Sequence, residues 1–153
     1  MLATAATTAI EDPAAWLSHR PPFLFVDRAD AGEDRLSLRA QRRFPADEAF
    51  FSGHFPGEPV VPGVILIELL AQAANLLLSW RAGHTVRGYL VGVEGAKFNQ
   101  TVHPGQLVNV DIRFAEPPRP VPAGAARFST FHGVAHVDQR RCMRAAVNIY
   151  HIG

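Results

Sequence analysis

The chain has 153 residues, 48% of them hydrophobic and 19% charged, which is enough for one domain with a real core and too apolar for a disordered chain. Its formal net charge of +1 argues against nucleic acid or an anionic membrane as the main partner. The one cysteine, Cys142, excludes an intrachain disulfide and a cysteine-cluster metal site, and we expect a cytoplasmic protein.

The N-terminal part of the chain gives only short structural signals. Residues 1–11 are rich in alanine and threonine, and we expect a frayed N-terminal extension without the basic and apolar segments of a secretory signal. Asp12 followed by proline predicts an N-cap and a short helix to about Ser18. The apolar run Phe23–Val26 is interpreted as a strand, and the alternation along Arg35–Arg43 predicts a half-buried strand.

A glycine- and proline-rich segment and a long apolar segment follow. Phe44–Pro62 is predicted to be a structured loop, after which a helix runs to about Trp80 and ends at Gly83. The stretch Val60–Trp80 is long enough to suggest a membrane span, but it contains Glu68. A carboxylate near the centre of a spanning helix costs about 2.5–3.5 kcal/mol on insertion scales, so we expect a core helix and no membrane insertion.

The remainder of the chain reads as strands. The predicted strands are Gly88–Phe98, Leu107–Glu116, Ala126–Val137 and Arg141–His151, and the prolines of 117–122 mark a turn or loop. One long helix among several antiparallel strands is an α+β plan. We therefore expect residues 12–153 to form a single domain of this class.

The predicted helix carries one polar stripe. Glu68, Gln72, Asn75 and Ser79 follow the spacing i, i+4, i+7 and i+11, so they share one helical face. Glu68 is the only charge among them, and burying it ionised is expensive unless hydrogen-bond donors hold it. A carboxyl group in such a place is suited to general acid catalysis. The alternative is that the stripe simply faces solvent.

The loop before the helix places three glycines and three prolines around His54. Glycine lets a backbone approach a ligand closely, proline fixes the chain, and an imidazole can act as a general base near neutral pH. The loop enters the helix at Gly63, where free N–H groups and the helix dipole suit a developing oxyanion. The alternative is a histidine used for local hydrogen bonding, but the combination of these features favours catalysis.

The segment SGHFPGEPVVPGVILIELLAQAA, residues 52–74, closely resembles the signature of the β-hydroxyacyl-acyl carrier protein dehydratases of bacterial fatty acid synthesis. Three further stretches are similar to the same family: HRPPFLFVDRA from His19, AKFNQTVHPGQLV from Ala96 and GVAHVDQRRCMRAAV from Gly133. The departures are Pro21, where the family usually has an aromatic residue, the prolines of 117–122, and the arginines at positions 140 and 141.

The resemblance implies a hotdog fold, in which an antiparallel sheet wraps a long central helix. It implies removal of water from a (3R)-3-hydroxyacyl thioester to give the trans-2-enoyl thioester, in fatty acid or related polyketide-type synthesis. The family's catalytic histidine falls on His54 and its acidic residue on Glu68. In the family's homodimers, and in the larger oligomers built from them, these two residues come from different subunits and meet at the interface.

The resemblance also implies substrate-binding residues and a partner. The N–H that meets the thioester carbonyl falls on Gly63, followed by Val64, and the carbonyl that orients the histidine falls on Val60. The family's supporting glutamine falls on Gln72. The substrate arrives on an acyl carrier protein, and the reaction needs no cofactor. Arg81, Arg87 and Lys97 are candidate contacts for an acidic carrier.

Two other functions share this fold class. A hotdog acyl thioesterase would hydrolyse the thioester, and a non-catalytic hotdog would only bind acyl carriers or a partner subunit; His54 together with Glu68 favours the dehydratase. The sister dehydratase-isomerases carry aspartate where this chain has Glu68. His132 and His136 have a zinc spacing on a helix, but four residues of a strand span about 13 Å, so we expect no metal site.

Overall fold

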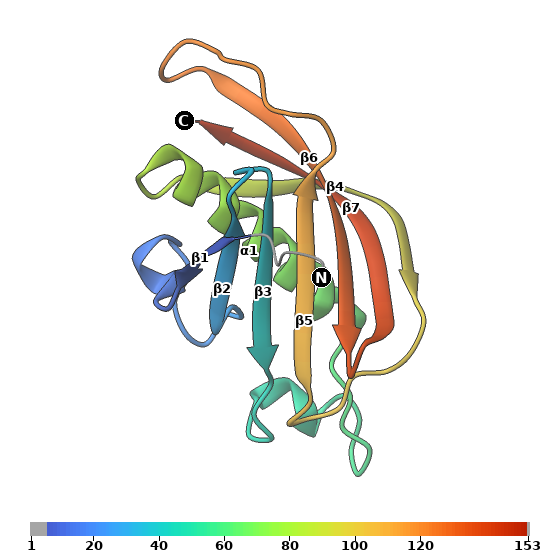
Figure 1. Cartoon of the computed structure of the whole chain (residues 1–153). Helices are drawn as coiled ribbons and strands as arrows, with labels where there is room; N and C mark the ends of the chain where they lie inside the picture. The colour runs from blue at the N-terminus through green and yellow to red at the C-terminus, as the bar shows by residue number, and fades with distance from the viewer. Residues whose placement is uncertain (1–5, 153) are drawn as a thin grey trace.

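The computed structural model describes residues 6–152, in which one seven-stranded sheet curves around one long helix (Figure 1). The sheet order is β1-β2-β3-β5-β6-β7-β4, and every neighbouring pair is antiparallel. The strands are β1 (Thr7–Ile10), β2 (Arg28–Gly32), β3 (Ser37–Arg43), β4 (Gly88–Phe98), β5 (Leu107–Phe114), β6 (Ala126–Val137) and β7 (Arg140–Ile152). This arrangement confirms the predicted α+β class and the hotdog fold.

Helix α1 (Gly63–Ala82) lies inside the curve of the sheet and forms the centre of the core. It ends at Gly83, whose φ of 77° is left-handed and whose N–H donates to the carbonyls of Ser79 and Trp80. The helix is long and apolar enough to cross a membrane, but 67% of its most apolar window is buried inside the protein. Its hydropathy is therefore that of a core helix.

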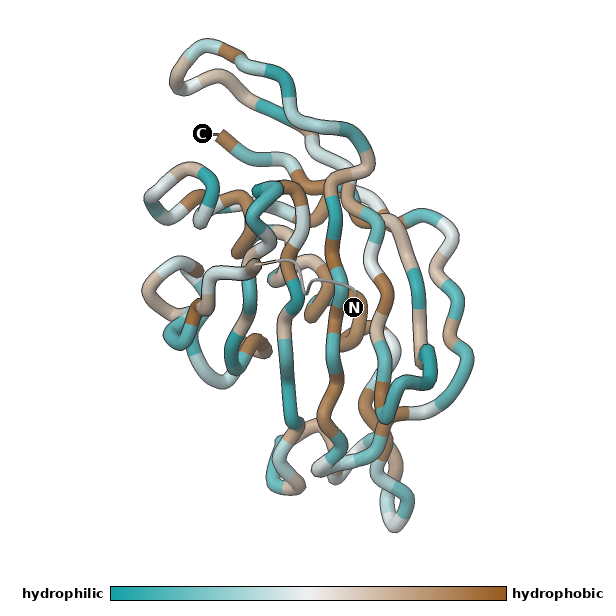
Figure 2. The backbone as a smooth tube through the Cα atoms, in the orientation of Figure 1, coloured by the Kyte–Doolittle hydropathy of each residue, from teal (hydrophilic) through white to brown (hydrophobic). Residues whose placement is uncertain are grey.

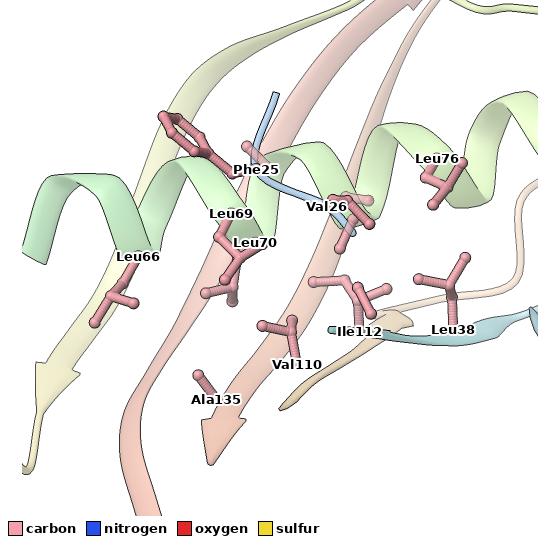
Figure 3. Close-up of a cluster of buried hydrophobic side chains, with 14 of the residues drawn as sticks. Phe25, Val26, Leu38, Leu66, Leu69, Leu70, Leu76, Val110, Ile112 and Ala135 are labelled. Atoms are coloured by element: carbon pink, nitrogen blue, oxygen red, sulfur yellow. The ribbon is translucent and has the colours of Figure 1, made fainter. Parts of the chain in front are cut away.

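The core forms where α1 meets the concave face of the sheet. Figure 2 shows apolar residues along α1 and at alternate positions of β5, as the sequence pattern of β5 predicts. The contacting side chains include Leu66, Leu69, Leu70 and Leu76 from α1 and Leu38, Val110, Ile112 and Ala135 from the sheet (Figure 3). A Cβ at Gly133 would lie 1.8 Å from a methyl of Leu70, so the missing side chain lets α1 approach β6 closely.

The N-terminal third differs most from expectation. The extension expected to fray contains β1, because Thr7–Ile10 pairs with β2 and buries Ile10; the expectation for residues 1–5 lies outside the described residues. The helix expected after Asp12 is only the short 3-10 helix η1 (Pro13–Ala15). Phe23–Val26 is not a strand, because its backbone turns to α1 instead of the sheet.

The C-terminal strands agree closely with expectation. The bounds of β4 and β6 match the predicted ones, β5 ends at Phe114, and β7 extends one residue further at each end. The proline-rich segment 117–122 connects β5 to β6 without helix or strand. Cys142 is buried in β7, and burial raises the pKa of its thiol.

Candidate active site

His54 stands in a loop between the 3-10 helix η2 (Ala49–Ser52) and α1. The loop is closed by backbone hydrogen bonds: Phe55 and Glu58 exchange N–H and carbonyl contacts at 3.0 and 2.9 Å, and the Val60 N–H donates to the His54 carbonyl at 3.0 Å. Gly57, at φ +76°, occupies the tip of this turn in a conformation that side-chain-bearing residues rarely adopt. The loop therefore presents His54 from a defined backbone.

The ring of His54 is held in one tautomer. Its Nδ1 lies 3.0 Å from the carbonyl oxygen of Val60. A carbonyl only accepts, so the neutral ring carries its proton on Nδ1 and leaves the lone pair on Nε2 free. The neighbouring Phe55 ring stacks on it at a centroid distance of 4.0 Å. His54 is thus a half-buried, oriented base.

The amino end of α1 follows this loop directly. Pro62 caps the helix without a side-chain acceptor, and its carbonyl receives the N–H groups of Ile65 and Leu66 at 2.9 and 3.3 Å. The N–H groups of Gly63 and Val64 precede these and remain available to a ligand. A Cβ at Gly63 would lie 3.0 Å from the ring of Phe98, so a side chain here would require that ring to shift.

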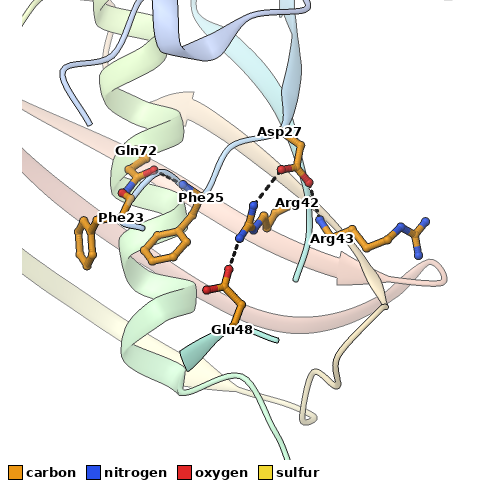
Figure 4. A network of polar contacts seen from close by, with 7 residues as sticks. All are labelled: Phe23, Phe25, Asp27, Arg42, Arg43, Glu48 and Gln72. Atoms are coloured by element: carbon orange, nitrogen blue, oxygen red, sulfur yellow. Dashed lines mark hydrogen bonds and ion pairs between the residues drawn. The ribbon is translucent and has the colours of Figure 1, made fainter. Parts of the chain in front are cut away.

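Gln72 fixes Glu68 from one turn further along α1. Gln72 is fully buried, and its Nε2 donates to Glu68 Oε1 at 3.0 Å and to the Phe23 carbonyl at 2.9 Å. Its own Oε1 accepts the Phe25 N–H at 2.8 Å (Figure 4). Both amide hydrogens and the carbonyl are used, so Gln72 has a single orientation. The Glu68 side chain, which remains 19% exposed, is positioned by this amide.

His19 is a second neighbour of Glu68, to which the sequence reasoning gave no role. Its Nε2 lies 3.6 Å from Glu68 Oε1, and its Nδ1 is buried without a hydrogen-bond partner in the described residues. Burial lowers the pKa of His19, while the charge of Glu68 opposes that shift. The sequence feature that could have identified His19 is its position at the start of HRPPFLFVDRA, one of the stretches that resemble the dehydratase family.

An ion-pair network joins the segments that carry these side chains (Figure 4). Arg42 of β3 contacts Asp27 at 2.9 Å and also pairs with Glu48, the residue before η2. Its guanidinium lies 5.7 Å from the ring of Phe25 and 4.9 Å from that of Phe44. Arg42 therefore connects the segment before β2, whose backbone bonds Gln72, to the loop that leads to His54.

The remainder of the polar stripe has a different use. Asn75 donates to the Val86 carbonyl at 3.0 Å, and the Val86 N–H donates to the Ser79 hydroxyl at 2.9 Å. Asn75 and Ser79 are buried, so the alternative of a stripe facing solvent is wrong for them. They hold the chain that returns from α1 towards β4.

The structure brings the predicted residues together in two groups. Val60 holds His54, and Gln72 holds Glu68, but no hydrogen bond or ion pair joins His54 to Glu68 within residues 6–152. Neither residue lines the main cavities found in that part of the chain. No group of three or more His, Cys, Asp or Glu side chains is placed to hold a metal ion among the described residues.

Comparison with known families and proteins identifies the family to which the chain belongs. The FabA-like domain family matches residues 17–146. The chain is 39% identical over 135 residues to the 3-hydroxyacyl-acyl carrier protein dehydratase FabZ of Proteus mirabilis, covering 86% of this chain and 85% of that protein. It is 36% identical over 141 residues to the FabZ dehydratase of Blochmanniella pennsylvanica, covering 90% and 89%.

Solved structures agree on the fold. The dehydratase heterocomplex ApeI:P from Xenorhabdus doucetiae aligns with a TM-score of 0.75 and 16% identity, covering 92% of this chain and 91% of that chain. A hypothetical thioesterase from Streptococcus pneumoniae aligns with a TM-score of 0.57 and 9% identity, covering 78% and 80%. Because the family model matches residues 17–146 and the curated relatives align over most of the chain, the chain belongs to the FabA-like family, together with the 3-hydroxyacyl-acyl carrier protein dehydratases.

Proposed function

We propose that this 3-hydroxyacyl thioester dehydratase uses His54 as its base and Glu68 as its acid, on a substrate carried by an acyl carrier protein. The observation that carries the proposal is the orientation of the two side chains. Val60 leaves the Nε2 lone pair of His54 free, and Gln72 fixes one oxygen of Glu68 while the side chain stays reachable. Val60 orients His54 and Gln72 orients Glu68, and neither Val60 nor Gln72 takes part in the proton transfers.

The proposed reaction is an elimination. His54 Nε2 takes the proton from C2, and the negative charge moves to the thioester oxygen, near the N–H groups of Gly63 and Val64. One such donor is typically worth about 2.7–4 kcal/mol in the transition state. Glu68 then protonates the C3 hydroxyl as it leaves as water. The steps are redox-neutral, and water is the only group that leaves. A single histidine that moves both protons is the alternative.

A second copy of the chain would complete the site. β4 lies at the edge of the sheet and pairs on one side with β7. It exposes apolar side chains at Tyr89, Val91 and Val93, and a long apolar edge strand is a template for pairing with another chain. Phe98 at its end touches Gly63, so an interface along β4 would border the helix amino end. A homodimer of this kind would bring His54 towards the partner's Glu68.

The proposal includes a carrier protein and a cytoplasmic location. Carrier proteins of this type are generally acidic, and Arg87 and Lys97 are exposed cations near β4. Arg81 is less available, because its guanidinium donates to the Arg35 carbonyl and packs 5.3 Å from the ring of Phe114. We therefore retain Arg87 and Lys97 as the carrier contacts.

One incubation separates the candidate activities. The protein is mixed with a 3-hydroxyacyl thioester on a carrier protein, and the products are resolved by mass spectrometry. A trans-2-enoyl thioester supports the dehydratase, and addition of water to that product in the reverse direction should also be observed. Accumulation of free carrier thiol would point to a thioesterase, and unchanged substrate to a non-catalytic hotdog.

A further inference from the structure

A cavity lies at the carboxyl end of α1, the end away from His54. Its volume is about 250 Å³, and it is bordered by the last turn of α1, the strands β6 and β7, and the proline-rich segment 117–122. The amino end of α1 and this carboxyl end are separated by about 27 Å of helix. The proposed dehydration uses none of the cavity's residues, and the proline-rich segment is one of the departures from the family pattern.

The polar wall of the cavity is basic. Arg81, Arg119 and Arg127 line it, and no aspartate or glutamate is among its lining residues. Glu116 borders the adjoining cavity and forms no ion pair with Arg119 or Arg127 in the described part of the chain. Three guanidinium groups around one hollow without a lining carboxylate give it a positive potential, which favours a bound anion.

Two buried donors in this wall lack acceptors. His151 is only 3% exposed, and its Nδ1 has no hydrogen-bond partner among the described residues. The Nε of its cross-strand neighbour Arg127 is buried and unpartnered in the same way. Buried polar atoms are almost always paired in folded proteins, so this pair of atoms beside a cavity marks a place for an acceptor, from a water or from a ligand.

Ser129 occupies one of the two ring nitrogens of His151. The Ser129 hydroxyl lies 2.9 Å from His151 Nε2. Burial and the charge of Arg127 lower the pKa of His151, so the ring is neutral near neutral pH. When the hydroxyl donates to Nε2, the single ring proton sits on Nδ1. Nδ1–H of His151 and Nε–H of Arg127 then both require an acceptor.

The apolar residues that line the cavity indicate which kind of anion it would bind. The floor is apolar and includes Leu78, Val86 and Phe114, which a hydrated inorganic ion would leave uncovered. The carboxyl end of α1 opposes an anion with about half a unit charge, but the three arginines outweigh it. The guanidinium fork matches a carboxylate in particular. The lining therefore fits a carboxylate attached to a short apolar body.

We propose that this cavity is a binding site for a small organic carboxylate, distinct from the active site. The carboxylate accepts from Arg127 and His151, and its hydrocarbon part lies on Val86 and Phe114 beneath the proline-rich segment. The site would let a free acid bind the enzyme away from the reacting groups.

Hexanoate is the probe, and the ring of His151 is the reporter. Binding to the full-length protein is followed by NMR of histidine labelled in the imidazole ring, which separates this site from any hexanoate held near His54. We expect saturable shifts of the His151 signals, with weaker binding of acetate and none of 1-hexanol. Equal binding of 1-hexanol, or unshifted His151 signals up to about 10 mM hexanoate, would overturn the proposal.

Arg127→Gln is the decisive variant and Arg140→Gln its matched control, since Arg140 lies exposed at the β6–β7 turn. The first should weaken hexanoate binding at His151 by about tenfold or more, and the second should leave it unchanged. Ser129→Ala provides a second test that removes no charge, and it should also weaken binding. Equal losses in the control, or none in both site variants, would contradict the assignment.

Discussion

The two halves of the polar stripe on α1 use similar side chains in opposite ways. Asn75 and Ser79 are buried, and both direct their polar groups to the backbone of Val86. In the other half, the fully buried Gln72 leaves the carboxylate of Glu68 partly exposed. A buried polar side chain that satisfies the backbone serves the fold, whereas one that positions an exposed ionisable group serves chemistry. Substitutions in each half can break or sharpen this distinction.

The largest effect is expected from His54→Ala. Loss of a positioned general base should reduce kcat/KM by about 10²–10⁴-fold, and the free energy of unfolding should change little because the ring is only half-buried. Steady-state kinetics and urea unfolding measure the two quantities. His84→Ala, at an exposed histidine after α1, is the control and should change neither.

Glu68→Gln should also reduce turnover severely while leaving the fold intact. The amide keeps the shape of the side chain but cannot deliver a proton, and its carbonyl oxygen can still accept the hydrogen bond from Gln72 Nε2. We expect a loss of about 10²–10⁴-fold in turnover. The double variant with His54→Ala should be little less active than the less active of the two single variants. Two losses that multiply would instead indicate groups that act independently.

Ser79→Ala should have the opposite profile. It leaves the buried Val86 N–H without its acceptor, which costs about 1–3 kcal/mol of unfolding free energy. Because Ser79 lies three helical turns from Glu68, kcat/KM should stay within twofold or so of the wild-type value. A large kinetic loss at unchanged stability would remove the distinction between the two halves of the stripe.

A smaller effect concerns pH. Burial lowers the pKa of His19 and of His151, so the folded protein takes up these protons less readily than the unfolded chain. Stability should therefore be full above the ordinary histidine pKa of about 6.5 and fall as the pH drops through it. His151→Gln should flatten this slope in urea unfolding between about pH 7 and 5.5, whereas His84→Gln should not.

Local signals predicted the strands after α1, the helix and the His54 loop, because alternation, capping residues and glycine spacing act over a few neighbours. β1 was missed because it buries only Ile10. β2 was missed because its two buried residues, Ala29 and Ala31, are too small to give a clear hydrophobic alternation. The Arg42 network joins residues from three separate segments, and His19 meets Glu68 only through the fold. Contacts of this kind produce no periodic pattern in the amino-acid sequence, so they could not be predicted from it.

The central claim, a site shared between two subunits, has one direct test. His54→Ala and Glu68→Gln proteins are each nearly inactive alone, and they are mixed, unfolded and refolded together. If one chain supplies the base and its partner the acid, half of the dimers are hybrids with one intact site of two, so activity should recover to about one quarter of the wild-type value. Activity that stays at the level of the separate variants would contradict a shared site and place both groups within one chain.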